Sequence, residues 1–370
     1  MGCEVRRVRE CTAFIFLIGV LVTSVSGVSA STRGAHVVGG LGDNPALLGF
    51  APSFTVASEA QVATPGVAGA QDQLDEWYDD ESKKLSIRLD FSSEEKAEQT
   101  MAEIDQVLGA FNGIEGRGMA GLSVGRVGLG TTASGFTRVV NSSRFDPEAD
   151  NEAGFSANLD ATFSAVERAD VVLAVGAPVG TALAWGAAVK VSRFFAEELV
   201  VEATAEEIEE DSTAADPQST YEVGSGVLVD AGLALNLKYF QVDVALKDIG
   251  NVEWRAEQPP WDDAATVGPV RQHDKPVHIA GGVVLKPFGC LDLSARCEKS
   301  VLGNSILRTE AVWRPVRWLT LKGGQVAVDD QPVYYTAGGG VRLWMFGLDG
   351  GIAVRDRTVV GGRARLSVGF

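Results

Sequence analysis

The C-terminal half of the chain alternates apolar and polar residues with a period of two. From Val227 to Leu237 every odd-numbered residue is apolar, whereas the even positions include Asp230 and Asn236. Successive side chains of a β-strand point to opposite faces, so this period predicts strands with one apolar face rather than amphipathic helices. The same alternation returns in the segments 240–247, 277–286, 291–296 and 366–370.

Composition agrees with a β protein and excludes several classes. Hydrophobic residues make up 45% of the 370 residues, which excludes wholesale disorder. The 43 glycines disfavour long helices, because glycine costs conformational entropy in a helix interior. The net charge of −17 argues against a nucleic-acid partner, since phosphate binding requires clustered Lys and Arg.

Residues 1–30 have the features of a secretory signal peptide. Arg6, Arg7 and Arg9 precede an apolar run from Thr12 to Val22, and small residues follow up to Ala30. The run is shorter than the ~20 residues that a spanning helix needs, so cleavage is favoured over a retained anchor. We therefore expect an exported protein.

The connections between the predicted strands suggest a membrane barrel. Short turns bordered by aromatic residues alternate with longer polar links, which is typical of transmembrane β-barrels with short periplasmic turns. Charged residues such as Arg296 and Arg342 fall on the polar strand faces, where they suit a wet lumen. A soluble sandwich or propeller is the alternative. The expected turns are 238–239, 286–289, 314–317 and 345–347, and the expected links are 248–276, 299–304, 329–332 and 355–361.

The sequence thus predicts an all-β fold, a closed antiparallel transmembrane β-barrel over residues 49–370. Candidate strands of the N-terminal half, together with nine from Gly226 onward, give about 14 strands, within the range of single-chain barrels. These candidates are 50–58, 85–91, 119–129, 134–141, 156–166, 171–178 and 183–195.

Two segments differ from the strands. Residues 92–111 begin with a capping box and place Met101, Ile104 and Val107 at helical spacing, which predicts one short amphipathic helix. We expect it outside the wall, in a plug, at the periplasmic mouth or within a long loop. Residues 197–222 are strongly acidic, which predicts a solvated loop; they lack the spacing of a calcium-binding loop.

One motif is typical of a hydrolase. Gly121–Gly125 matches G-x-S-x-G, so a secreted esterase with Ser123 as nucleophile is a remote alternative. The residues that follow are a poor helix, however, and a nucleophile elbow requires a helix there. The three histidines show no metal-ligand spacing. We therefore expect no catalytic residues, no metal site and no cofactor.

The segment Gly42–Leu48 reads G-D-N-P-A-L-L. Its Asn44-Pro45-Ala46 resembles the N-P-A motif near the mature N-terminus of FadL-like outer-membrane proteins, a group that includes FadL transporters, PorV-type proteins and the TraF-like proteins of conjugal transfer. The predicted helix at 92–111, followed by Gly-rich strands, is most similar to the TraF-like branch.

This resemblance implies a fourteen-stranded barrel in the bacterial outer membrane, with residues 31–48 folded inside as a hatch. It further implies that small hydrophobic compounds bind in the lumen and leave through a lateral opening in the wall. A turn at Asn44-Pro45 that caps the first strand is the alternative to a hatch. The candidate hatch and lumen residues are Asn44, Pro45, Ala46, Asp230, Asn236, Arg296 and Arg342.

The expected partners follow from the same resemblance. They are outer-membrane lipid, the barrel-assembly machinery and a small hydrophobic molecule, with no nucleic acid. Leu366, Val368 and Phe370 form the candidate C-terminal assembly signal. The alternative function is a non-transporting outer-membrane scaffold for secretion, conjugation or surface assembly.

Overall fold

The structure is a computed structural model. It describes residues 39–51, 54–64, 78–79, 84–85, 94–146, 156–204, 218–255, 266–267, 277–299, 303–329 and 331–369. The predicted signal peptide at 1–30 and Phe370 lie outside these residues. Within the described segments, no helix has both the length and the apolar character needed to cross a membrane.

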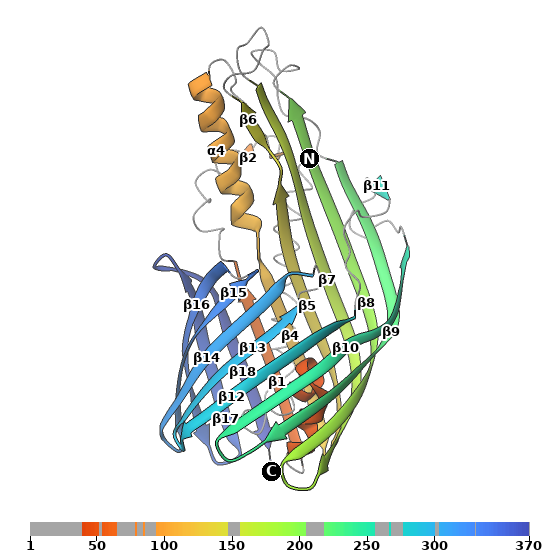
Figure 1. The fold of residues 1–370 in the computed structure, drawn as a ribbon, viewed down its shortest axis with the longest axis vertical. Coiled ribbons are helices and arrows are strands. Elements are labelled where there is room, and N and C mark those ends of the chain that lie inside the picture. The colour runs from red at the N-terminus through yellow and green to blue at the C-terminus, as the bar shows by residue number, and fades with distance from the viewer. Residues whose placement is uncertain are drawn as a thin grey trace.

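Fourteen antiparallel strands among the described residues close into one barrel, as the sequence predicts (Figure 1). Each strand pairs with its neighbours in chain order, and β18 pairs with β1 to close the ring. The strands are β1 (Phe54–Ala63), β4 (Glu115–Val124), β5 (Val127–Asn141), β7 (Ser156–Val179), β8 (Leu183–Thr204), β9 (Gln218–Asn236), β10 (Phe240–Arg255), β12 (His278–Phe288), β13 (Leu291–Lys299), β14 (Ser305–Val316), β15 (Leu319–Val328), β16 (Gln331–Leu343), β17 (Phe346–Arg355) and β18 (Thr358–Gly369).

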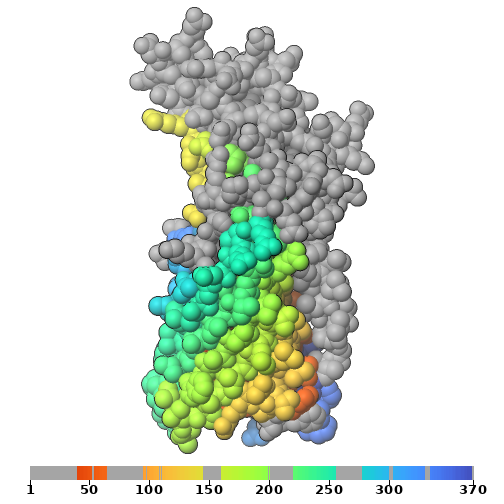
Figure 2. All heavy atoms as spheres, turned by 90° about the vertical axis from the view of Figure 1, so that its right-hand side faces the viewer, coloured from red at the N-terminus to blue at the C-terminus, as the bar shows by residue number. Residues whose placement is uncertain are grey.

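The predicted alternation separates an apolar outer face from a polar inner face. On β9, Val227 is 60% exposed, whereas Leu228 and Asp230 are buried. Figure 2 shows the outer face over β7, β8 and β9 in yellow-green and green. We call the exposed apolar side chains of β7–β10 the apolar belt; they include Val171, Leu173, Val175, Val189, Val191, Val227, Leu233, Val242, Val244 and Leu246. Such a belt is the outer surface expected of a barrel in lipid.

Short turns gather at one end of the barrel, which we call the turn end. They lie at 125–126, 180–182, 237–239, 289–290, 317–318 and 344–345. The four predicted aromatic turns fall at this end, each within a few residues of its expected place. The predicted long link at 355–361 is wrong, because Asp356 and Arg357 form a two-residue turn with φ of 49° and 70°. Positive φ at both positions gives the tight hairpin connection that matches strand twist.

At the opposite end β7 and β8 project beyond their neighbours. β7 has 24 residues and β8 has 22, and they pair along their whole length. The two predicted strands at 156–166 and 171–178 are therefore one, and the predicted strand at 119–129 contains the β4–β5 turn. The predicted acidic loop at 197–222 is also corrected. Its first part continues β8 to Thr204, because β8 pairs with β7 that far, and its last part begins β9 at Gln218; residues 205–217 lie outside the described residues.

The predicted helix is present as α4 (Glu94–Phe111), and Met101, Ile104 and Val107 form its buried face. It packs against β5, β7 and the short strand β6 (Arg144–Asp146) at the end opposite the turn end (Figure 1). A position in the plug is thus wrong, because the helix packs against the projecting strands outside the barrel. Three further short strands are described: β2 (Tyr78–Asp79), β3 (Lys84–Leu85) and β11 (Thr266–Val267).

The N-terminal segment lies inside the barrel near the turn end (Figure 1). It consists of a π-helical turn, η1 (Gly39–Asp43), and a 3-10 helix, η2 (Pro45–Phe50), and we call residues 39–50 the plug. η2 packs on β7, β8 and β9, and η1 packs on β5 and β7. The predicted hatch ends at residue 48; the plug continues two residues further because η2 ends at Phe50.

Candidate functional site

Asn44 fastens the plug to the wall. It is fully buried, and its side-chain Oδ1 accepts a hydrogen bond of 2.9 Å from the Ala46 backbone N–H, which makes it the N-cap of η2. Its Nδ2 donates to the backbone oxygens of Leu233 at 3.1 Å and Val244 at 3.0 Å. One amide therefore joins the plug to both β9 and β10. The alternative, a turn capping the first strand, is wrong because Asn44-Pro45 caps η2 instead.

Glycines in the wall make room for the plug. A Cβ on Gly232 would lie 2.0 Å from Oδ1 of Asn44, and a Cβ on Gly186 would lie 2.3 Å from backbone atoms of Pro45 and Ala46. Real contacts of a Cβ are longer than 3.0 Å, so only glycine allows this close approach. Pro45 suits the first position of η2, because a backbone N–H at that position would have no hydrogen-bond partner within the helix.

Apolar packing adds to these contacts. Leu41 and Leu48 of the plug are buried in a cluster with Met119 and with Val172 and Ala174 of β7. These are inward residues of the wall, so the plug buries apolar surface that would otherwise face the lumen. Burial of such side chains stabilises by about 25 cal/mol per Å² of apolar area removed from water.

A first group of charges joins β7, β8, β9 and β10 above the plug. Arg168 makes a bidentate pair with Asp248, with both nitrogen–oxygen distances at 2.7 Å. Lys190 pairs with Asp248 and, at 2.6 Å, with the predicted lumen residue Asp230. All of these side chains are at most 9% exposed, so each charge has lost most of its hydration. The ion pairs with its neighbours compensate this desolvation.

A second group joins β4, β13 and β14. Arg308 pairs with Glu115 and with Glu298. Arg117 approaches the same Glu298 at 3.1 Å. The hydroxyl of Tyr334 donates to Glu115 at 3.3 Å. Two buried carboxylates are therefore compensated by two arginines across the lumen.

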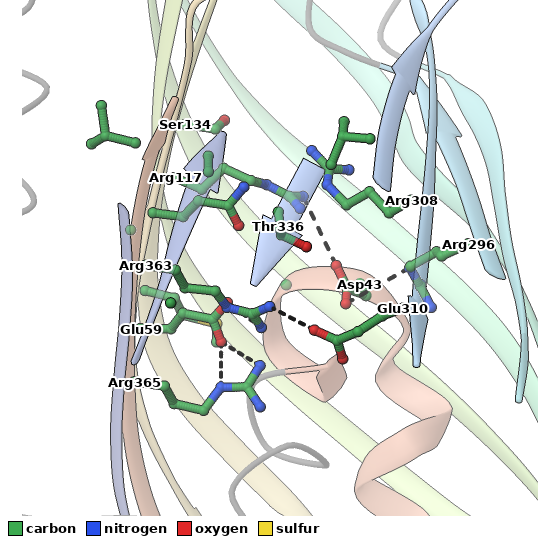
Figure 3. Close-up of a pocket in the computed structure, with 18 of the residues that line it drawn as sticks. Asp43, Glu59, Arg117, Ser134, Arg296, Arg308, Glu310, Thr336, Arg363 and Arg365 are labelled. Carbon is green, nitrogen blue, oxygen red and sulfur yellow. Dashed lines mark hydrogen bonds and ion pairs between the residues drawn. The ribbon is translucent and has the colours of Figure 1, made fainter. Parts of the chain in front are cut away.

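A third group joins β1, β14 and β18. Arg363 contacts Glu59 at 2.8 Å and Glu310 at 3.5 Å, and Arg365 contacts the same Glu59 at 2.5 Å (Figure 3). Nearby, Lys322 pairs with Asp349 at 2.7 Å. These pairs put a line of alternating charge on the wall opposite η2.

A cavity of about 320 Å³ lies between the plug and these charges (Figure 3). Among the described residues that line it, nine are Lys or Arg and five are Asp or Glu. The apolar part of the lining includes Leu41 of the plug, Met119 of β4 and Val326 of β15. The cavity thus combines apolar patches with an excess of cationic side chains, although the whole chain is acidic.

The predicted site residues do not all lie together. Asn44, Pro45 and Ala46 are in the plug, and Arg296 lies beside it, paired with Asp243 at 3.0 Å. Arg342 lies instead at the turn end, where its backbone N–H donates to Trp318 at 2.8 Å. Asn236 is near the same end and accepts a hydrogen bond of 2.8 Å from Lys286.

The candidate assembly signal lies on the closing strand. Leu366 is opposite Ser58 of β1, and Val368 is opposite Val56 of β1 and Phe346 of β17. Val368 is only 5% exposed, unlike most outward apolar residues, because it lies between these two side chains. Phe370 is outside the described residues.

Sequence reasoning missed Asp43, Arg117 and Lys247. Lys247 donates to the backbone oxygen of Gly42 at 2.8 Å, and Asp43 lies 3.9 Å from Arg117. Arg117 could have been found, because Glu115, Arg117 and Met119 alternate with glycines and alanine and so share the inner face of a strand. Lys247 could also have been found, because it continues the inward alternation of Asp243 and Ala245 along β10.

Ser123 is not placed for catalysis. It lies in β4, is fully buried, and the chain continues through the turn at 125–126 into β5. A nucleophile elbow needs a strand-to-helix turn that exposes the serine, so the esterase hypothesis lacks its structural context. Within the described segments, no group of three or more His, Cys, Asp or Glu side chains could hold a metal ion.

Comparison with known proteins gives structural similarities only. No family model and no curated protein matches the chain. It is similar to the toluene transporter TbuX of Ralstonia pickettii, with 11% identity, a TM-score of 0.45, and coverage of 93% of this chain and 94% of that one. For the toluene transporter TodX of Pseudomonas putida, identity is 11%, the TM-score is 0.42, and coverage is 89% and 91%. For outer membrane phospholipase A of Escherichia coli, identity is 8%, the TM-score is 0.25, and coverage is 86% and 92%.

Proposed function

We propose that this chain is a channel of the bacterial outer membrane that passes small, largely hydrophobic compounds through its lumen when the plug moves. The observation that carries the proposal is the cavity of about 320 Å³ beside the plug, inside a closed barrel. Its volume is at the lower end of the range for small-molecule sites. The plug is the obstacle between this cavity and the turn end.

The lining supports a compound with an apolar body. Leu41, Met119 and Val326 offer apolar contacts, and glycines of β16 and β17 let a ligand approach the backbone closely. The charged side chains of the lumen are largely paired with one another, so much of their hydrogen-bonding capacity is already used. A neutral group can therefore lie against them without breaking an ion pair.

The outside of the barrel supports the location and the partners. We propose that outer-membrane lipid covers the apolar belt, because exposed apolar side chains there alternate with inward polar ones. The closing strand β18 would be bound by the barrel-assembly machinery, with Leu366, Val368 and Phe370 as its signal. We propose that the turn end faces the periplasm, because the short turns of outer-membrane barrels lie on the periplasmic side.

The channel is tested by uptake in cells whose own outer membrane excludes the probe. We expect cells that express the chain to take up ¹⁴C-toluene faster than cells with an empty vector. Gly186→Ala should change the uptake rate severalfold, because the added Cβ clashes with the backbone of Pro45 and displaces the plug. Gly323→Ala is the matched control, since its Cβ meets nothing closer than 3.9 Å and Gly323 lies outside the cavity lining. Uptake equal to the vector in all three strains would refute the channel.

One observation favours a second function, a scaffold for envelope assembly. β7 and β8 project beyond the barrel, and α4 supports them, so the structure offers a rigid surface away from the lumen (Figure 1). A photo-crosslinker placed at the exposed Glu98 of α4 would bind covalently to a partner docked there. A single envelope protein captured in cells without toluene uptake would support the scaffold over the channel.

A further inference from the structure

Asp43 is the only charged residue of the plug, and its carboxylate faces the cavity (Figure 3). It lies between two arginines of the wall, 3.9 Å from Nη2 of Arg117 and 3.7 Å from Nε of Arg296. Its side chain keeps 27% of its exposure, more than most of the lumen carboxylates. The plug therefore places one accessible anion between two cations.

These two contacts of Asp43 are longer than most ion pairs of the lumen. Arg168–Asp248, Lys190–Asp230 and Lys322–Asp349 have nitrogen–oxygen distances of 2.6–2.8 Å, which are hydrogen-bonded pairs. The two contacts of Asp43 are too long for hydrogen bonds. A solute that reaches hydrogen-bonding distance would thus replace a weak interaction with a stronger one.

The arginines have donors to offer. In the described part of the chain, Nε and Nη2 of Arg296 and Nε of Arg308 are buried and have no hydrogen-bond partner. A buried donor without a partner is destabilising, so a ligand that accepts a hydrogen bond from it binds more tightly. A carboxylate is the group that best matches the planar guanidinium.

We propose that Asp43 occupies an anion-exchange site, and that the carboxylate of a solute in the cavity displaces it from Arg117 and Arg296. This rests on the proposed channel and gives its solute an anionic group. With Asp43 displaced, η1 loses its contacts with β4 and β13 and keeps the hydrogen bond from Lys247 of β10 to Gly42. η2 stays fastened through Asn44. The solute itself thereby loosens the half of the plug that borders the cavity.

Binding measurements on the purified full-length protein in detergent test the exchange. Benzoate is the probe, and benzamide is its neutral counterpart of nearly equal shape. We expect Asp43→Asn to bind benzoate about fivefold more tightly, because the internal competitor loses its charge but keeps its size; a factor of five corresponds to about 1 kcal/mol. Arg296→Gln should weaken benzoate binding about tenfold or more, and benzamide should be indifferent to both changes.

Arg314→Gln is the matched control. Arg314 pairs with Asp292 at 2.8 Å and lies outside the cavity lining, so its loss should leave benzoate affinity unchanged. The exchange is refuted when Asp43→Asn and the wild type bind benzoate equally, or when benzamide binds as tightly as benzoate.

Hydrogen exchange gives a second readout that does not depend on Arg296→Gln folding well. Benzoate should speed exchange of the amides in η1, such as Gly42, and leave Leu47 of η2 unchanged; benzamide should change neither. Uniform exchange with and without benzoate contradicts the release of η1. Neither the binding measurement nor the hydrogen-exchange measurement depends on transport. A negative result for the anion-exchange site is therefore distinguishable from a negative result for toluene uptake.

Discussion

Lys247 and Asp248 are consecutive residues of β10, yet both side chains are buried in the lumen, at 7% and 2% exposure. Consecutive residues of a regular strand face opposite sides. Here a β-bulge lies between Leu246 and Ile249, and Asp248 has a φ of 61°. Lys247 lies on the regular inward face of β10 and reaches the plug, whereas the bulge turns Asp248 inward as well, where it pairs with Arg168.

Asp248→Ala should destabilise the barrel by about 3–5 kcal/mol, the cost of leaving buried charges without their partner. Arg168 and Lys190 would both lose an ion pair in a place that water reaches poorly. The free energy of unfolding by urea in lipid vesicles measures the change.

Glu253→Ala is the control for this measurement. Glu253 is on the same strand and pairs with Arg255 at 3.3 Å, but both side chains are about three-quarters exposed. An exposed pair contributes about 0–1 kcal/mol, so this variant should unfold almost as the wild type does. Equal stability of Asp248→Ala and Glu253→Ala would contradict the buried network.

Asn44→Ala should loosen η2 without unfolding the barrel. The change removes the N-cap and both hydrogen bonds to β9 and β10, and leaves the backbone oxygens of Leu233 and Val244 without this donor. We expect a loss of about 2 kcal/mol, so amide exchange at Leu47 and Ala51 should be about thirtyfold faster. Asn236→Ala, which removes only the contact with Lys286, should leave these amides unchanged.

The barrel could be predicted because its strands alternate apolar and polar residues. An apolar outer face and a polar lumen require this alternation, and the residues from Val227 to Leu237 show it directly. The amphipathic helix was equally visible from Met101, Ile104 and Val107. The position of the helix in the fold could not be predicted, because a helical period identifies the buried face but not the strands that cover it.

Strand lengths and loop lengths were harder to predict. The acidic residues from Glu197 onward are typical of a loop, but pairing of β8 with β9 continues to Val200 and pairing with β7 continues to Thr204. Backbone hydrogen bonds overrode side-chain polarity there. At Asp356-Arg357 the sequence offers no glycine, so a two-residue turn was not expected.

The site was predicted in part because alternation gives the face of a residue but not its height along the barrel. Arg296 and Arg342 both follow the polar pattern, yet only Arg296 lies beside the plug. Asn44 could be identified from its motif. Asp248 could not, since the bulge that turns it inward leaves no mark in the alternation.

Arg357→Gly should stabilise the hairpin between β17 and β18. Arg357 has a φ of 70°, which costs an L-residue roughly 1–2 kcal/mol and costs glycine nothing. We expect a gain of about 1 kcal/mol in the free energy of unfolding. Arg355→Gly is the comparison, because Arg355 pairs with Thr358 within the ladder and glycine weakens a strand. A loss of stability in Arg357→Gly would show that its side chain matters more than its backbone strain.

Leu173→Lys tests whether lipid covers the apolar belt. Leu173 is 54% exposed near the middle of the barrel wall, whereas its neighbour Val172 is fully buried, so the added charge would face outward. A lysine at the bilayer midplane costs about 2–4 kcal/mol, and one near the interface costs about 0–1 kcal/mol. Leu343→Lys supplies the second case, because Leu343 is 65% exposed beside the turn at 344–345. The free energy of unfolding in vesicles should therefore fall clearly for Leu173→Lys and only slightly for Leu343→Lys. Similar stability of both variants would mean that water, rather than lipid, borders this face.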